Sequence, residues 1–240
     1  MKVIIVGGVA GGATAAARLR RLDETAEIVV FERSGYVSYA NCGLPYYIGG
    51  VITDKEELTL QTPESFWRRF RVDMRVRHEV TAIHPAEKTV DVRNLATGET
   101  FTESYDKLVL SPGARPTQPA LPGVGIDRLF NLRTVEDTLK IREFIEQHHP
   151  RSAVLAGGGF IGVELMENLR ELGIDVTVVQ RPRQLLNPLD ADMAAFLHAK
   201  LRQKGVRLHL GCTVEGFAAN GDRVNVLLKD EAPLRSEERR

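Results

Sequence analysis

The chain has little of several residue types that mark specialised protein classes. Only two of its 240 residues are cysteines, Cys42 and Cys212, which excludes a disulfide framework and favours a reducing cytoplasm. Aromatic residues make up 6%, and Lys plus Arg equal Asp plus Glu at 32 each, so no net charge attracts nucleic acid or an anionic membrane. The first apolar run, residues 3–6, is too short for a signal peptide or a membrane span. We therefore expect no nucleic acid partner, no membrane contact and, since the isolated histidines lack ligand spacing, no metal site.

One arrangement occurs twice: a short apolar strand, a glycine cluster and a helix. In the first copy a strand at 3–6 enters Gly7-Gly8-Val9-Ala10-Gly11-Gly12, followed by an Ala-rich helix at 13–22 and a strand at 27–31 that ends before Glu32. This is the dinucleotide fingerprint, in which glycines admit a pyrophosphate to the helix N-terminus and the acid binds ribose hydroxyls. Val9 departs from it, because the pattern has its middle glycine there. A glycine turn that serves only helix–strand packing is the alternative.

The second copy satisfies the full glycine pattern. A strand at 153–156 leads into Gly157-Gly158-Gly159-Phe160-Ile161-Gly162, then a helix at 163–172 that Gly173 would end, and a strand at 176–179. The ribose position is Gln180, followed by Arg181 and Arg183. An acid there would repel a 2′-phosphate, whereas an amide with arginines can accept it. The sequence therefore predicts NADPH, with NADH as the alternative if these arginines are ordinary loop charges.

Between the copies the pattern changes to alternation. Strands at 78–84, 89–93 and 100–102 are expected to form an antiparallel meander, and a strand at 107–110 to return to the parallel sheet before Ser111 and Gly113. Prolines and glycines at 112–125 indicate a domain boundary. The expected fold is α/β, with two Rossmann-like dinucleotide-binding units built on parallel sheets, the first carrying the meander.

The stretch at 36–50 places Cys42 between Asn41 and Gly43, with Pro45 suited to the first turn of a helix. A thiol at a helix start is stabilised as the thiolate, its reactive form. An inert, partly buried cysteine is the alternative. Arg18 and Arg21 share one face of the first helix, either as solvated charges or as a phosphate clamp. Two dinucleotide sites suggest a resident flavin and a nicotinamide that visits.

Together these motifs resemble the pyridine nucleotide-disulfide oxidoreductases, and within them the single-cysteine coenzyme A-disulfide reductase branch. The resemblance is carried by residues 7–12 with 15–22 and by 38–45, and it makes Val9 a trait of the branch. It implies FAD under Cys42, hydride transfer from NADPH or NADH, and a Cys42 thiolate that reduces coenzyme A disulfide or a related persulfide or polysulfide. For the full-length family it also implies a homodimer. Residues 1–118 would bind FAD and carry the redox cysteine, 119–228 would bind NAD(P)H, and 229–240 would be a charged tail.

The resemblance also implies site residues. The expected substrate contacts are Thr14, Arg18, Arg21, Ser38 and Asn41. The expected cofactor contacts are Gly7, Gly8, Ala10, Gly11, Gly12, Glu32, Arg33, Val80, Ser111, Gly113, Gly157, Gly159, Phe160, Ile161, Gly162, Glu164, Gln180, Arg181 and Arg183.

Three alternatives compete with this interpretation. Paired-cysteine enzymes are excluded because no second cysteine closely follows Cys42. Relatives that reduce oxygen or peroxide through a cysteine sulfenic acid carry a histidine in the first glycine turn, where this chain has Ala10. The non-enzymatic alternative is a nucleotide-binding module without turnover. The chains of this family continue into a Gly-Asp turn, which contacts the flavin, and into a dimerisation domain. Because a chain that ends at Arg240 lacks these contacts, we expect it to bind FAD weakly.

Overall fold

The computed structural model describes residues 1–117, 119–229 and 234–235. The chain divides into two compact units, Met1–Ala40 with Lys55–Arg115, and Asn41–Asp54 with Pro116–Arg240. Each contains a parallel sheet and an antiparallel sheet, so the expected α/β fold is confirmed. The division differs from the expected domains in one important respect. The segment that carries Cys42 groups with the second unit.

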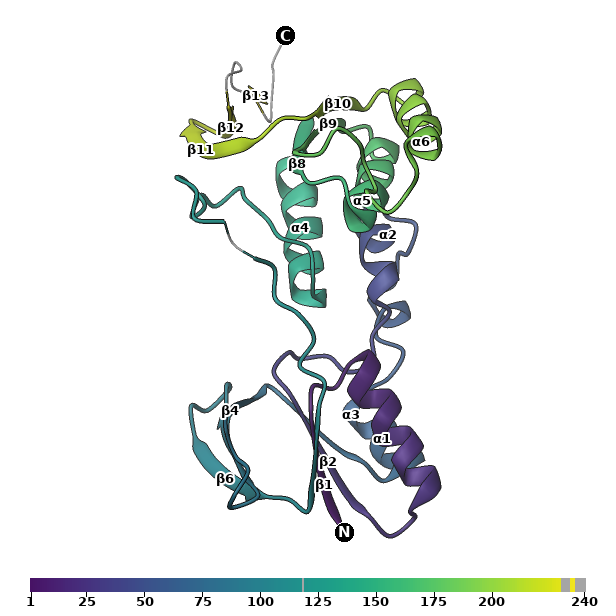
Figure 1. Cartoon of the computed structure of the whole chain (residues 1–240), viewed down its shortest axis with the longest axis vertical. Helices are drawn as coiled ribbons and strands as arrows, with labels where there is room; N and C mark the ends of the chain where they lie inside the picture. The colour runs from purple at the N-terminus through teal and green to yellow at the C-terminus, as the bar shows by residue number, and fades with distance from the viewer. Residues whose placement is uncertain (118, 230–233, 236–240) are drawn as a thin grey trace. The chain divides into compact units, whose positions relative to one another are not determined.

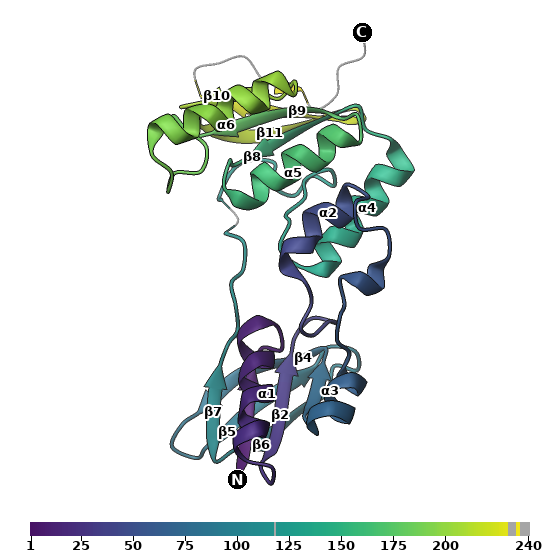
Figure 2. The same ribbon diagram turned by 90° about the vertical axis from the view of Figure 1, so that its right-hand side faces the viewer.

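The first unit is built on a four-stranded parallel sheet of order β3-β2-β1-β7. Its strands are β1 (Lys2–Val6), β2 (Glu27–Glu32), β3 (Asp73–Val76) and β7 (Lys107–Leu110). Helices α1 (Ala10–Leu22) and α3 (Pro63–Phe70) cover one face, and the antiparallel strands β4 (His78–His84), β5 (Thr89–Asn94) and β6 (Thr100–Ser104) cover the other (Figures 1 and 2).

The strands of this sheet are continuous apolar runs because both faces are buried. Val3 and Ile5 pack in the core under the helices, whereas Ile4 packs in the core shared with the meander. The predicted strand–helix–strand unit, meander and return strand are confirmed. Helix α3, which begins with a capping box formed by Thr62 and Ser65, and the neighbouring strand β3 were not expected from the sequence.

The second unit repeats this plan with a three-stranded parallel sheet of order β10-β9-β8. The strands are β8 (Ser152–Ala156), β9 (Asp175–Gln180) and β10 (Arg207–Leu210). One apolar core joins the sheet to α2 (Leu44–Ile48), α4 (Val135–His148), α5 (Phe160–Glu171) and α6 (Ala191–Gln203). A second core joins it to the antiparallel strands β11 (Val214–Asn220), β12 (Arg223–Leu228) and β13 (Leu234–Arg235).

The cysteine segment belongs to the second unit because α2 is anchored on α4 and α5. Ile48 is fully buried in the helical core of that unit. Arg142 on α4 donates from Nη1 to the carbonyl oxygens of Tyr47 at 2.8 Å and Ile48 at 3.4 Å. Gly49 approaches α5 so closely that a Cβ there would lie 2.2 Å from Oδ1 of Asn168. The sequence carried no signal for these contacts, which join residues far apart in the chain.

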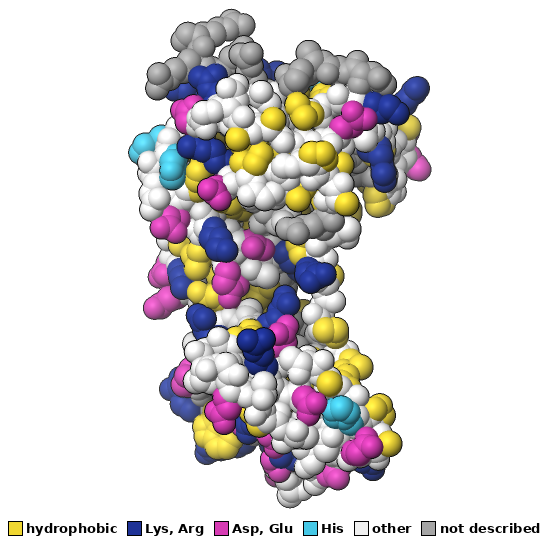
Figure 3. All heavy atoms as spheres, turned by 90° about the vertical axis from the view of Figure 1, so that its left-hand side faces the viewer, with side chains coloured by type: hydrophobic (Ala, Val, Ile, Leu, Met, Phe, Trp, Pro, Cys, Tyr) yellow, Lys and Arg dark blue, Asp and Glu magenta, His cyan; other side chains and the backbone are white. Residues whose placement is uncertain are grey.

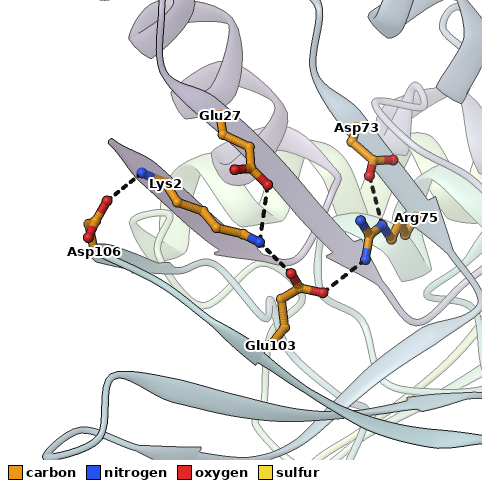
Figure 4. A network of polar contacts seen from close by, with 6 residues as sticks. All are labelled: Lys2, Glu27, Asp73, Arg75, Glu103 and Asp106. Carbon is orange, nitrogen blue, oxygen red and sulfur yellow. Dashed lines mark hydrogen bonds and ion pairs between the residues drawn. The ribbon is translucent and has the colours of Figure 1, made fainter.

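A charged network ties the strand starts of the first unit to its meander (Figure 4). Its members are Lys2, Glu27, Asp73, Arg75, Glu103 and Asp106. Glu103 on β6 accepts from Lys2 and, at 3.2 Å, from Arg75. The hydrogen bond to Glu103 raises the pKa of Lys2. Burial raises the pKa of Glu103, but Lys2 and Arg75 outweigh it and lower that pKa overall.

The remaining expectations concern the tail and the surface. Within the expected tail, Leu234–Arg235 form a short strand paired with β12, and residues 230–233 and 236–240 lie outside the described residues. In the described parts of the chain, no helix combines the length and the apolar character needed to span a membrane, and no cluster of metal-ligating side chains occurs. On the face drawn in Figure 3, acidic and basic side chains are interspersed.

Candidate functional site

The first glycine turn joins β1 to α1. Gly7 has a φ of +97°, which favours glycine, and a Cβ on Gly12 would lie only 1.7 Å from the carbonyl oxygen of Gly7. Gly12 therefore lets the helix pack directly against the turn. Val9 is the N-cap residue, with a φ of −99° and a ψ of −131°, outside the usual helical and extended regions. Its φ is negative, so the position does not require a glycine.

Glu32, at the end of β2, is held by this turn. Its Oε2 accepts from the Gly8 N–H at 2.7 Å, and its Oε1 accepts from the Ser34 N–H at 2.8 Å. A carboxylate has further lone pairs on both oxygens, which remain available for ribose hydroxyls. Helix α1 begins without a side-chain cap and without an acid in its first turn, an arrangement suited to a pyrophosphate. The residues present therefore fit a dinucleotide such as FAD.

The other predicted flavin contacts differ in their exposure and in what they contact. Ser111 lies beside the turn, since a Cβ on Gly11 would be 3.3 Å from its Oγ, while Ala10 at the start of α1 is exposed. Gly113 is exposed with a φ of +70°. Arg33 is exposed and lies 3.6 Å from Glu79 in an ion pair. Val80 packs against the apolar core under the meander.

The second glycine turn joins β8 to α5 and repeats the first. Gly157 has a φ of +124°, and a Cβ on Gly162 would lie 2.4 Å from the Gly157 carbonyl oxygen. A Cβ on Gly159 would meet nothing within 4 Å, so the turn is open on that side. Phe160 and Ile161 are 62% and 47% exposed at the start of α5. Glu164, one turn on, is half-buried and accepts through its carbonyl from Asn168 at 2.8 Å.

Gln180 occupies the place that Glu32 has in the first unit. Its Oε1 accepts from the Gly158 N–H at 2.9 Å, and its Nε2 donates to the Gln184 carbonyl at 3.4 Å. The amide thus adds a donor at a position where Glu32 has only acceptors. Arg181 and Arg183 follow on the loop and are exposed. Donor groups therefore gather at this end of β9, and such groups can bind a phosphate.

Cys42 is exposed in a 3₁₀ turn (Asn41–Gly43) that precedes α2. Pro45 lies in the first turn of α2, as predicted. Helix α2 has only five residues, so its dipole supports a thiolate less than a long helix would. Oδ1 of Asn41 is buried and has no hydrogen-bond partner among the described residues. A buried acceptor of this kind suits a donor from a bound ligand.

The three arginines of α1 have different roles. Arg18 and Arg21 are exposed on the face that also carries Thr14, as expected for ligand contacts or solvated charges. Arg20 instead donates to five backbone carbonyls. These belong to Asp23, Glu24, Ala26, Phe70 and Arg71. Thr14, Arg18, Arg21 and Ser38 lie in the first unit, and Asn41 with Cys42 lies in the second, so their common site remains a prediction.

Sequence reasoning missed several residues that shape the second unit. Arg170 follows Gly162 at the same spacing as Arg20 follows Gly12, so aligning the two halves of the chain would have found it. Arg142 and Asn168, which hold the cysteine segment, carry no such signal. His198 on α6 accepts a hydrogen bond from the loop after β9, and an isolated histidine in a helix does not indicate this.

The family comparison agrees with this geometry. The family model for pyridine nucleotide-disulphide oxidoreductases matches residues 1–236. The chain belongs to this family.

Individual relatives point to one branch. The chain is 41% identical over 209 residues to a coenzyme A disulfide reductase of Staphylococcus haemolyticus, covering 87% of this chain and 47% of that protein. A crystal structure of reduced Bacillus anthracis CoADR-RHD superposes with a TM-score of 0.95 at 48% identity, covering 98% of this chain and 42% of that one. An NAD-dependent persulfide reductase from A. fulgidus gives a TM-score of 0.90 at 34% identity, with 95% and 42% covered. The chain spans about half the length of the curated relatives it matches.

Proposed function

We propose that this chain carries the nucleotide sites and the redox thiol of a flavin-dependent NAD(P)H oxidoreductase that reduces coenzyme A disulfide or a related persulfide or polysulfide in the cytoplasm. The observation that carries the proposal is the exposed Cys42 on a segment anchored on α4 and α5 of the second nucleotide-binding unit. Cys212, the other cysteine, is half-buried on another part of that unit. The names of the relatives supply the substrate class.

A single thiol is sufficient for the proposed reaction. The Cys42 thiolate attacks one sulfur of the disulfide, the S–S bond breaks, and the first coenzyme A leaves as its thiolate. The mixed disulfide on Cys42 then takes up two electrons from NAD(P)H, and the second coenzyme A is released with a proton from solvent. Bound FAD supplies the relay for the two electrons between nicotinamide and sulfur.

The chain's own residues hold the reactants. Glu32 and the turn from Gly7 to Gly12 would hold the adenosine and pyrophosphate of FAD. Gln180, Arg181 and Arg183 would bind the ribose end of NADPH, with donors suited to a 2′-phosphate. Thr14, Arg18, Arg21, Ser38 and Asn41 would bind coenzyme A, the arginines through its phosphates.

The decisive test replaces the thiol in the flavin-loaded protein. Cys42→Ser should abolish reduction of coenzyme A disulfide while NAD(P)H still bleaches the flavin absorbance, because the step that needs sulfur follows the step that does not. Cys212→Ser is the matched control and should keep both activities. Disulfide reduction that persists in Cys42→Ser would show the proposal to be wrong.

The substrate is tested separately. Charge reversal at Arg18 or Arg21 should raise KM for coenzyme A disulfide about tenfold with a smaller change in kcat, since a charge-assisted contact contributes about 1.5 kcal/mol. A small neutral disulfide that reacts equally well would favour a persulfide or polysulfide substrate. Turnover with oxygen or peroxide and none with disulfides would instead support the sulfenic-acid alternative.

A further inference from the structure

The loop between β9 and α6, residues 181–190, folds over the second glycine turn. The Gly158 carbonyl accepts from the Leu186 N–H at 2.9 Å. The side chain of Leu185 is fully buried and fills the space beside Gly158, where a Cβ would lie 2.1 Å from Leu185 Cδ2. Gly158 also donates to Gln180. The peptide groups on both sides of Gly158 are therefore fixed by this loop and by the residue that precedes it.

Helix α6 packs against the loop through the core that Leu185 shares with Leu201, and it also accepts a hydrogen bond from the loop. The Leu185 N–H donates to Nε2 of His198 at 3.0 Å. A backbone N–H can only donate, so Nε2 must present its lone pair and the imidazole must be neutral, with its proton on Nδ1. His198 thus acts on Leu185, and Leu185 acts on Gly158 in the glycine turn.

The surroundings of His198 favour its neutral form. Burial and, after it, the charge of Arg202 one turn along α6 lower the pKa of His198 below its usual value of 6.5. The other charged or titratable side chains on α6, on the 181–190 loop and on β10, which packs against α6, are Asp192, Lys200, Arg181, Arg183, Asp190, Arg207 and His209.

We propose that His198 is a positioning residue for the nicotinamide nucleotide: its neutral imidazole keeps Leu185 against Gly158, and its protonation releases the loop and weakens nucleotide binding. If Nε2 were protonated, two donors, the Nε2–H and the Leu185 N–H, would face each other. The Leu185 N–H would then have to turn away. The inference rests on the proposed function only in assigning a nicotinamide nucleotide to this turn.

The test measures NAD⁺ affinity by calorimetry between about pH 8 and about pH 5. NAD⁺ is the probe because it lacks the 2′-phosphate of NADP⁺, which itself titrates near pH 6 as phosphate monoesters do. Affinity of the unmodified chain should fall about fivefold below the ordinary histidine pKa, the equivalent of one lost hydrogen bond.

Two variants separate the hydrogen bond from the charge. His198→Gln places an amide oxygen near the position of Nε2 and cannot titrate, so its affinity should match the unmodified chain at about pH 8 and stay flat on acidification. His198→Phe keeps a ring but offers no acceptor, so binding should be about fivefold weaker at every pH. His149→Asn, at an exposed residue beyond α4, is the control and should keep the original pH profile.

The outcomes distinguish the two proposals. A flat NAD⁺ profile in the unmodified chain, or an acid fall that persists in His198→Gln, would overturn the role of His198 and leave nucleotide binding intact. A folded chain that binds neither NAD⁺ nor NADP⁺ at any pH would overturn the nucleotide site of the proposed function as well. If His198→Phe fails to fold, the profiles of the unmodified chain and of His198→Gln still decide.

Discussion

The two glycine turns have the same backbone design and opposite chemistry at one side chain. In each, the N–H of the second glycine, Gly8 or Gly158, donates to the side chain at the end of the next strand. That side chain is Glu32 in the first unit and Gln180 in the second. A carboxylate can only accept, whereas an amide also donates. Exchanging one oxygen for an NH₂ group therefore keeps the hydrogen bond to the turn and adds a donor at this position.

The correspondence continues along both helices. Arg20 on α1 donates to carbonyls in the loop after the helix and to Phe70 and Arg71 before β3. Arg170 on α5 donates to the carbonyls of Ile174 and of Lys204, just before β10. Each arginine joins its helix to the segment that enters the neighbouring edge strand. The repeat therefore includes these arginine–carbonyl hydrogen bonds as well as the glycines.

The largest effects should come from adding a methyl group inside the turns. Gly12→Ala forces a Cβ to within 1.7 Å of backbone and should lower the free energy of unfolding by at least about 3 kcal/mol. Gly162→Ala, at 2.4 Å, should lower it by about 2 kcal/mol. Urea denaturation measures both.

Gly159→Ala is the control for the pair. Its Cβ would meet nothing within 4 Å, so stability should change by less than about 0.5 kcal/mol while nucleotide affinity falls, because the methyl group occupies the open side of the turn. Equal destabilisation by Gly159→Ala and Gly12→Ala would contradict the steric account.

Replacing the two arginines should have unequal effects, both smaller than that of Gly12→Ala. Arg20→Met keeps the aliphatic stem but removes donors to five carbonyls, and should destabilise by about 2–3 kcal/mol. Arg170→Met removes donors to two carbonyls and to Asp175, and should cost about 1–2 kcal/mol. Thermal unfolding followed by circular dichroism gives the order. The reverse order would show that the number of hydrogen bonds does not determine how much each arginine stabilises the fold.

Part of this comparison could be predicted from the sequence. Glycines with unusual backbone geometry, the flanking apolar strands and the contrast of Glu32 with Gln180 are all local patterns, and the structure places them as those patterns indicate. Long-range packing was beyond local patterns. Ile48 belongs to the core of the second unit because of helices more than ninety positions away, and nothing near Cys42 reveals that. The capped helix α3 was missed although Thr62 and Ser65 are local signals.

Exchanging the ribose-position side chain should alter cofactor preference. Gln180→Glu keeps an acceptor for the Gly158 N–H but replaces the donor with a charge that repels a 2′-phosphate, so the NADPH-to-NADH affinity ratio should fall about tenfold, or about 1.4 kcal/mol. Affinities for both nucleotides, measured side by side, check this. Glu32→Gln is the matched control in the other unit and should leave the ratio unchanged. Tighter binding of NADH than NADPH by the unmodified chain would contradict the expected preference.

The smallest effect contrasts one histidine from each unit. A hydrogen bond to Asp91, at 2.8 Å, and the Asp91 charge raise the pKa of His84, so its stabilisation is complete below pH 6.5 and is lost as the pH rises through the raised value. Burial lowers the pKa of His198, so its stabilisation is present above pH 6.5 and is lost as the pH falls. Unfolding free energies are measured at about pH 8 and about pH 5.5. On acidification, the unmodified chain should gain stability relative to His84→Gln. It should lose stability relative to His198→Gln. The His198 difference should stay below about 1 kcal/mol because the side chain is partly exposed to solvent. If both differences changed in the same direction, one of the two hydrogen bonds would be assigned to the wrong protonation state.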